Sequence, residues 1–133
     1  MPVFHAHIPK GRFGKEQKKA IGNALNQSLI QGLGIPPGDR FIIISEHAED
    51  ELFIDPTFMG MERSENAMII NVLIGMHRPL SDKRTLMAAI TRLLEESVGI
   101  SPDDVFIAMV PVPNENFSFG KGIPQLAEIT PKW

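Results

Sequence analysis

GIPPGDRFI, at residues 34–42, returns 65 positions later as GISPDDVFI, at residues 99–107. Each copy opens on a glycine, and a proline follows within three residues. Glycine can adopt the left-handed conformation that ends a helix, and proline cannot continue one. The repeat therefore predicts one helix that ends at Gly34 and a second that ends at Gly99. Because strand-forming residues complete each copy, a strand is expected to follow each helix.

The segment before each copy has the apolar spacing of an amphipathic helix. The residues on the expected buried faces are Ile21, Ala24, Leu25, Ser28 and Leu29 in the first segment, and Leu86, Ala89, Ile90, Leu93 and Leu94 in the second. Ser81 is the predicted N-cap of the second helix, with Asp82 in its first turn, where a negative charge is favourable. The repeated unit therefore extends well upstream of the quoted stretch.

Four stretches rich in strand formers complete the pattern, at residues 3–8, 40–45, 67–74 and 105–110. The chain is predicted to be a single α+β domain built from two βαβ units. The predicted parts are the first unit at 2–46, a linker loop at 47–66, the second unit at 67–111 and a C-terminal tail at 112–133. Right-handed crossovers place both helices on one face of a four-stranded mixed sheet.

The other face of that sheet is expected to lack a cover within one chain. Residues 41–44 and 68–70 are apolar at consecutive positions, and such strands are usually buried on both faces. A single copy has no further helix for the second face. The sequence therefore predicts a homo-oligomer.

Composition excludes several classes of function. The chain has 133 residues, 43% hydrophobic and 22% charged, with a net charge of −3 and no cysteine. Thiol nucleophiles, disulfides and iron–sulfur clusters are thereby excluded, and an acidic balance disfavours binding to nucleic acid. No apolar run is long enough for a membrane span. Lys10 and Arg12 follow the first apolar segment instead of preceding it, so no secretory signal is expected and a cytoplasmic location is predicted.

Pro2 is the principal candidate for catalysis. Initiator methionine is normally removed when the next residue is small, and removal would leave Pro2 with a free secondary amine at the start of a buried strand. An α-amino group titrates near ~7.7–8.0, and burial or cationic neighbours lower that pKa, so such an amine could act as a neutral base. In the alternative interpretation Pro2 has no role, and if Met1 stays attached the Pro2 nitrogen is an amide that cannot act.

Asp39 and Arg78 are the other two candidate catalytic residues. Asp39 stands at the head of the second strand, where it could hold water or a substrate hydroxyl. Its repeat equivalent, Asp104, shows that it could equally be a turn residue. Arg78 follows the third strand, and arginine suits the bidentate binding of a carboxylate. A solvated loop arginine is the alternative, and Arg40 is a second candidate for substrate binding, with a salt bridge to the acidic linker equally plausible.

The remaining motifs carry weaker signals. His5 and His7 share one face of a strand but lack a defined third ligand, so no metal site is predicted. The glycines at 11 and 14 have the wrong spacing for a phosphate-binding loop. The linker carries six carboxylates between Glu46 and Glu62 and is a further place for part of the site. Phe117 and Phe119 in the tail are expected to line a pocket or a subunit interface.

Taken together, Pro2, the two repeats and the stretch NFSFG at residues 116–120 resemble the tautomerase superfamily, more narrowly its malonate semialdehyde decarboxylase branch. The resemblance covers residues 2 to about 122. It implies a homotrimer without a cofactor, acting on a small carboxylate. It also implies that Pro2 is the catalytic amine, Asp39 the polar partner that handles water, and Arg78 the carboxylate clamp.

Two positions depart from that branch. The familiar decarboxylase pattern has a second arginine where this chain has Leu80, and often a tryptophan where it has Phe117. The favoured activity is therefore tautomerase-type proton transfer by a neutral Pro2 amine on an enol or keto carboxylate. Two alternatives stay open: a decarboxylase or hydratase that uses a protonated Pro2 or an iminium, and a non-enzymatic trimeric binding module.

Overall fold

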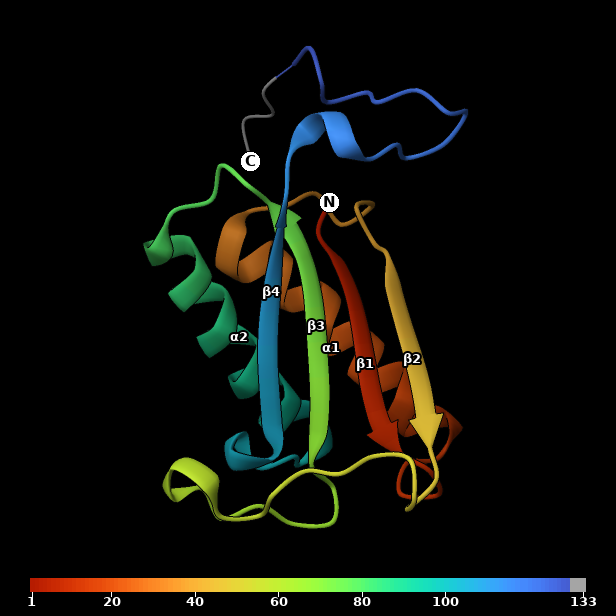
Figure 1. Ribbon diagram of the computed structural model, residues 1–133, viewed down its shortest axis with the longest axis vertical. Coiled ribbons are helices and arrows are strands. Elements are labelled where there is room, and N and C mark those ends of the chain that lie inside the picture. Colours follow the sequence, from red (N-terminus) through yellow and green to blue (C-terminus); the bar gives the residue numbers. More distant parts are fainter. Residues whose placement is uncertain (130–133) are drawn as a thin grey trace.

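The computed structural model describes residues 1–129, so the last four residues of the predicted tail, 130–133, lie outside the described residues. The elements follow the order βαβ, linker, βαβ (Figure 1). They are β1 (Val3–Pro9), α1 (Lys15–Leu33), β2 (Ile42–His47), β3 (Met68–Gly75), α2 (Leu80–Val98) and β4 (Val105–Val112). Short 3-10 turns lie at Phe58–Gly60, Pro102–Asp104 and Asn114–Asn116.

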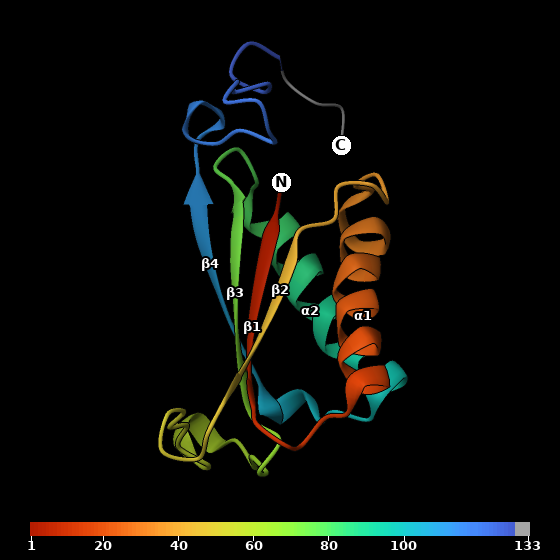
Figure 2. The same ribbon diagram turned by 90° about the vertical axis from the view of Figure 1, so that its right-hand side faces the viewer.

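The strands form one four-stranded mixed sheet in the order β2-β1-β3-β4. β2 is parallel to β1 and β4 is parallel to β3, while the two central strands, β1 and β3, are antiparallel. Both helices pack on the same face of the sheet (Figure 2). The predicted α+β architecture is confirmed.

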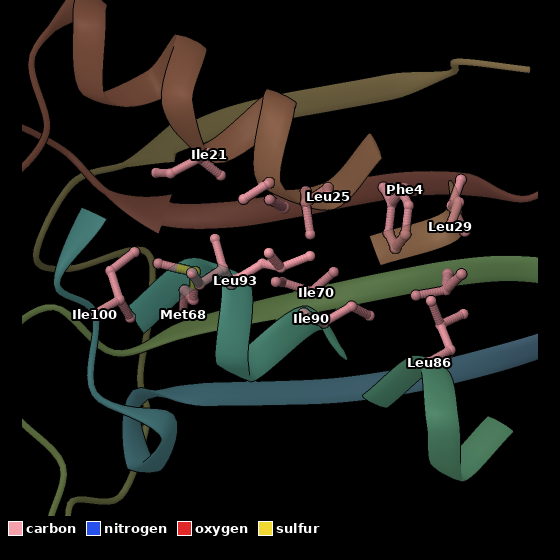
Figure 3. Close-up of a cluster of buried hydrophobic side chains, with 14 of the residues drawn as sticks. Phe4, Ile21, Leu25, Leu29, Met68, Ile70, Leu86, Ile90, Leu93 and Ile100 are labelled. Carbon is pink, nitrogen blue, oxygen red and sulfur yellow. The ribbon is translucent and has the colours of Figure 1, made fainter. Parts of the chain in front are cut away.

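The core lies between this face and the two helices (Figure 3). Every residue predicted for the buried helix faces is buried, including Leu25 of α1 and Ile90 of α2, which are fully inaccessible. Phe4 and Ile70 of the central strands pack against them from the sheet. Burying a side chain of this size contributes about 1.5–3 kcal/mol, so these residues account for most of the driving force for folding. Neither helix in residues 1–129 is long and apolar enough to cross a membrane.

The two repeated glycines end the helices as predicted. Gly34 and Gly99 adopt left-handed conformations with φ of 67° and 72°, and each donates its N–H to a carbonyl in the last helical turn. The isoleucine after each glycine is buried and closes the turn against the core. The N-cap prediction at Ser81 is wrong: α2 begins at Leu80 with the extended residue Pro79 as its cap, so Ser81 already lies inside the first turn.

The sheet face opposite the helices is uncovered in one chain, as Figure 2 shows. It presents Ile43, Leu73, Phe106 and Val110, each 40–51% exposed. Large exposed apolar side chains gathered on one face are typical of a surface that associates with another molecule. The prediction that another subunit covers this face stays a prediction.

Asp104 ties the linker to the second unit. The Asp104 side chain is buried and accepts two hydrogen bonds from Ser64, one from its backbone N–H at 2.7 Å and one from the Ser64 hydroxyl at 2.5 Å. Arg63 donates to the carbonyl of the adjacent Asp103 at 3.0 Å. These contacts hold the linker across the start of β4.

Asp104→Ala is expected to lower the free energy of unfolding by about 2–3 kcal/mol, because two hydrogen bonds to a charged group are lost and the Ser64 donors lose their partner. Urea denaturation measures this change. Asp50→Ala, at an exposed linker position, is the matched control and should be near neutral. Equal stability of the two variants would contradict a structural role for Asp104.

Candidate active site

The chain begins at one end of the sheet, where β1 and β2 start and β3 and β4 stop (Figure 1). The start of β1 lies beside the start of β2, and Phe4 donates its N–H to the Phe41 carbonyl at 2.9 Å. Because β1 is antiparallel to β3, the C-terminal ends of β3 and β4 lie at the same end of the sheet, where the N–H of Met76 donates to the Val112 carbonyl at 3.1 Å. Pro2 is buried at this end, directly before β1.

Asp39 lies next to the N-terminus. The ammonium group of Met1 is 2.6 Å from its Oδ2, so the Pro2 nitrogen is about one residue, ~3.8 Å along the chain, from that ion pair. The Asp39 side chain is only 9% exposed. Within the described residues its second oxygen, Oδ1, is buried and has no hydrogen-bond partner. A buried carboxylate oxygen without a donor is suited to accept a hydrogen bond from water or a substrate hydroxyl.

The two aspartates at the equivalent repeat position have different surroundings. Both oxygens of Asp104 accept hydrogen bonds from Ser64. Asp39 instead pairs with the Met1 ammonium through one oxygen, and its other oxygen has no hydrogen-bond partner among the described residues. The interpretation of Asp39 as a turn residue therefore describes Asp104 better than Asp39.

An aromatic pocket of about 170 Å³ adjoins the N-terminus. Its lining consists of Met1, Val3, Phe41, Leu73, Val112, Asn116, Phe117, Ser118 and Phe119. Phe119 lies with its ring 5.8 Å from that of Phe41 and packs edge-on against Phe117 at 5.4 Å. The tail thus forms a wall of the pocket in its own chain, and Phe41, which we did not predict, forms another part.

Backbone turns hold the tail aromatics in this position. Gly120, Lys121 and Gly122 all have positive φ, which turns the chain back sharply. Gln125 accepts from the N–H of Phe119 at 3.0 Å and donates to the Gly120 carbonyl at 2.9 Å. The local sequence signal for this arrangement is the close spacing of glycines after the aromatic pair.

Arg78 lies at the same end of the sheet but outside the lining of the pocket. It follows the turn after β3, where its N–H donates to the Gly75 carbonyl at 3.2 Å. Its largely buried side chain donates from Nη1 to Asp82 Oδ2 at 3.2 Å. The bond to the first turn of α2 orients the guanidinium, which has four further N–H donors.

Arg40 points elsewhere. Its Nη2 donates to Asn23 Oδ1 of α1 at 2.9 Å, on the helical side of the sheet. The structure places Pro2 and Asp39 next to Met1, which lines the pocket with Phe117 and Phe119, but Pro2 and Asp39 are not themselves lining residues. Arg78 lies at the same end of the sheet, and Arg40 does not line the pocket.

The linker lies at the opposite end of the sheet, so in one chain it contributes nothing to the aromatic pocket (Figure 1). It borders a second cavity of about 370 Å³, with Lys10, Arg12, His47 and Glu49 among its lining residues. Asp55 accepts hydrogen bonds from the N–H groups of Thr57 and Phe58, which lower the pKa of Asp55 and order the loop. Among the residues described, no group of three or more His, Asp or Glu side chains is placed to hold a metal ion.

Comparison with known families adds to this geometry. The model of a family described as tautomerase enzymes matches residues 39–120, and a second model with the same description matches residues 2–61. The chain belongs to the tautomerase family. Two relatives from Bacillus subtilis strain 168, the probable tautomerases YusQ and YrdN, resemble this tautomerase-family chain in sequence. YusQ is 28% identical over 96% of this chain and 100% of its own, and YrdN is 29% identical over 94% and 95%.

Solved structures narrow the branch. A malonate semialdehyde decarboxylase, described for its decarboxylase and hydratase activities, superposes with a TM-score of 0.86 at 28% identity, covering 92% of this chain and 94% of that one. A second malonate semialdehyde decarboxylase, inhibited by 3-bromopropiolate, has a TM-score of 0.86 at 31% identity and 93% coverage of each chain. A fused 4-OT described as a symmetric trimer shares the fold, with a TM-score of 0.78, 22% identity and coverage of 94% and 97%. The predicted branch, the one that resembles malonate semialdehyde decarboxylase, is confirmed.

Proposed function

We propose that this protein catalyses tautomerase-type proton transfer on a small enol or keto carboxylate, with the amine of Pro2 as catalyst after Met1 has been removed. The observation that carries the proposal is the buried Asp39 carboxylate, 2.6 Å from the ammonium of Met1, the residue before Pro2 and part of the lining of an aromatic pocket. The relatives described as probable tautomerases support the same class of reaction.

In the proposed reaction Pro2 accepts one proton from the substrate and returns one proton to it. The neutral Pro2 amine takes the hydroxyl proton of an enol, and the resulting ammonium returns a proton to carbon, so no net proton is consumed. Arg78 binds the substrate carboxylate and stabilises the negative charge that develops on the neighbouring oxygen. Asp39 accepts a hydrogen bond from the substrate or from water through its free oxygen, and the phenylalanines limit access of bulk water.

A decarboxylase or hydratase activity is the second candidate, and the ion pair itself favours it. In the unprocessed chain Asp39 pairs with the Met1 ammonium; if it paired in the same way with a protonated Pro2 after Met1 removal, that Pro2 would act as an acid toward the substrate carbonyl. The two solved malonate semialdehyde decarboxylases support this candidate. Leu80 argues against it, since it is an exposed apolar residue at the position of that branch's second arginine.

The proposed form of the enzyme is a homotrimer that needs no cofactor. In this proposal the small carboxylate is the principal ligand, and the uncovered sheet face provides the subunit contact. The solved fused 4-OT trimer supports that assembly by its shared fold.

One experiment separates these functions. Mass spectrometry first establishes the loss of Met1, and the protein is then assayed with a 2-hydroxydienoate, with phenylenolpyruvate and with malonate semialdehyde. Ketonisation of the first two supports a tautomerase, and release of CO₂ from the third supports a decarboxylase. NMR titration of the Pro2 nitrogen gives the chemical reason, because a pKa below about 8 favours base chemistry and one near or above about 9 favours acid chemistry. No turnover of any substrate by the processed chain would favour a binding module.

Asp39→Asn is expected to distinguish the two chemistries further. The amide keeps the shape and can still accept a hydrogen bond, but it cannot stabilise an ammonium. We expect tautomerase turnover to fall by roughly tenfold and any hydratase or decarboxylase turnover by about 10²-fold or more. Asp103→Asn, at the position before Asp104 and far from the pocket, is the control. If Asp39→Asn left every activity unchanged, Asp39 would have no part in the chemistry.

A further inference from the structure

Three histidines, His5, His7 and His47, form a cluster on the uncovered sheet face, here called the histidine network, in which His7 and His47 share a hydrogen bond and His5 stacks beside His7. His7 Nδ1 is 2.8 Å from His47 Nε2, and His5 Nε2 is 2.8 Å from the Ser45 hydroxyl. The rings of His5 and His7 are 4.0 Å apart, and those of His7 and His47 are 5.0 Å apart. The register of β1 with β2 produces this cluster, because His7 pairs with Ser45 and Pro9 with His47.

Apolar residues surround the network on the same face. Ile43 pairs with His5 in the register of β2, and on the other side β3 presents Asn71 opposite His5 and Ile69 opposite His7. Phe106 of β4 pairs in turn with Ile69 and is 47% exposed. The network therefore lies within a largely apolar surface that one chain leaves open to solvent.

No carboxylate compensates a positive charge on these rings. None of the three histidines forms an ion pair with any residue in the range 1–129. Glu46 is turned to the helical side, where it binds Lys18 at 2.7 Å. The second cavity, which His47 lines, is also lined by the charged residues Lys10, Arg12, Glu49 and Glu65. Asn71 and Ile69, which face the rings from β3, do not titrate.

The contact between His7 and His47 requires one ring to donate and the other to accept a hydrogen bond. Two neutral rings, or one neutral and one protonated ring, satisfy this requirement. Two protonated rings do not, because both then carry only donors. Burial lowers the pKa of His7, and the neighbouring His5 and His47 lower it further.

We propose that the histidine network makes the subunit contact over the uncovered face proton-sensitive, so that acidification separates the copies of this chain. The inference rests on the proposed homotrimer. A second copy fits because the face is largely apolar around a polar centre that can be neutral, and burying it in that form leaves no charge unpaired. The described part of the tail leaves the end of β4 at the end of the sheet opposite the linker (Figure 1), where residues 116–119 line the aromatic pocket.

The direction of the pH effect follows from linkage. Association removes water from the rings and favours their neutral form, so the separated chains bind more protons than the assembly. Self-association is therefore strongest above the histidine range and weakens as the pH falls through it. Each pKa unit of depression on assembly corresponds to about tenfold weaker association in acid.

Sedimentation velocity of the full chain between about pH 8 and about pH 5.5 tests the proposal. The wild type is expected to form an oligomer at the upper pH and to dissociate reversibly, with at least roughly tenfold weaker association, at the lower one. The double variant His7→Gln with His47→Gln should remain associated across the range. His77→Gln is the matched control, since His77 is exposed in the turn after β3 and off this face, and it should behave as the wild type.

Each remaining outcome overturns part of the proposal. A wild-type oligomer that is unchanged in acid, or a double variant that dissociates like the wild type, overturns the role of the histidines. A chain that is monomeric at every pH overturns the assembly as well. Loss of far-UV circular dichroism together with dissociation would mean acid unfolding instead. If the double variant fails to fold, NMR titration of the wild-type histidines tests the proposal instead. The pH midpoint of dissociation must then coincide with the titration midpoints of His7 and His47, and a mismatch overturns the proposal.

Turnover in the same buffers keeps this inference separate from the proposed function. A pH-insensitive oligomer that still acts on enol carboxylates contradicts only the switch. An oligomer that dissociates in acid but never shows turnover contradicts only the proposed activity.

Discussion

Pro2→Ala is expected to reduce turnover of enol and keto carboxylates by about 10²–10⁴-fold, the usual contribution of a positioned general acid or base. The processed variant would still have an amine, but a primary one on a rotatable bond. In Pro2 the ring fixes φ and leaves the nitrogen with a single orientation. Pro2 is buried at the start of β1, between Met1 and Val3, which both line the pocket, and the Met1 nitrogen next to it contacts Asp39. Steady-state kinetics on protein of verified N-terminal mass measures the effect.

Pro9→Ala is the matched control for this substitution. Pro9 is the last residue of the same strand, at the opposite end of the sheet, where it pairs with His47. Its replacement should therefore leave turnover near the wild-type value. Circular dichroism should show that both variants fold. Full activity of Pro2→Ala in chains that lack Met1 would refute a catalytic amine at this position.

Retention of Met1 should have the same effect as loss of the proline. With Met1 attached, its ammonium is the group that pairs with Asp39, and its side chain lines the pocket with only 4% exposed. The Pro2 nitrogen is then an amide with neither a proton to give nor a basic lone pair. Turnover in a preparation should therefore scale with the fraction of chains from which Met1 has been removed.

Arg78→Ala has the second-largest expected effect, a loss of roughly 10²-fold or more in kcat/KM. Two charge-assisted hydrogen bonds to the substrate carboxylate would be lost in a largely buried site. Arg78→Lys should recover only part of this loss, because an ammonium cannot make the planar two-point contact. Kinetics with the free carboxylate and with its ester provide the measurement. The ester should be a poor substrate for the wild type and should lose little on substitution.

Arg84→Ala, at an exposed position on α2, is the control and should leave kcat/KM unchanged. An equal loss for acid and ester in Arg78→Ala would indicate a structural contribution instead. That contribution has an identifiable source, since Arg78 also binds Asp82 in the first turn of α2. Asp82→Ala isolates it, because this variant removes the ion pair and keeps the guanidinium.

The secondary structure was accessible from the sequence because its signals are local. A glycine followed by proline ends each helix, and the spacing of apolar residues marks the buried side of each helix before any tertiary contact is known. The failure at Ser81 has a local cause as well. Pro79 is compatible with the extended conformation that precedes a helix, so α2 starts one residue before the serine and does not need its side chain.

The positions of the site residues depended on contacts between distant parts of the chain. Arg40 and Asp39 are adjacent in sequence, yet one contacts Asn23 of α1 and the other the N-terminus. Phe41 lines the pocket because Phe119 of the tail packs against it at the end of the sheet. Such choices arise from packing among residues that are far apart in sequence, and residue type alone does not specify them.

The sequence by itself determined two βαβ units, the residues that bury each helix face and a short set of candidate groups around Pro2. These features follow from backbone conformation and hydrophobic periodicity, which act over a few residues. Only the tertiary structure decided that β1 and β3 pair antiparallel, and this pairing brings four strand ends to the N-terminus. It also decided that Asp39 faces the N-terminus while its repeat equivalent Asp104 binds the linker. The physical reason is that similar local motifs receive different partners when the two halves of a sheet meet different segments of chain.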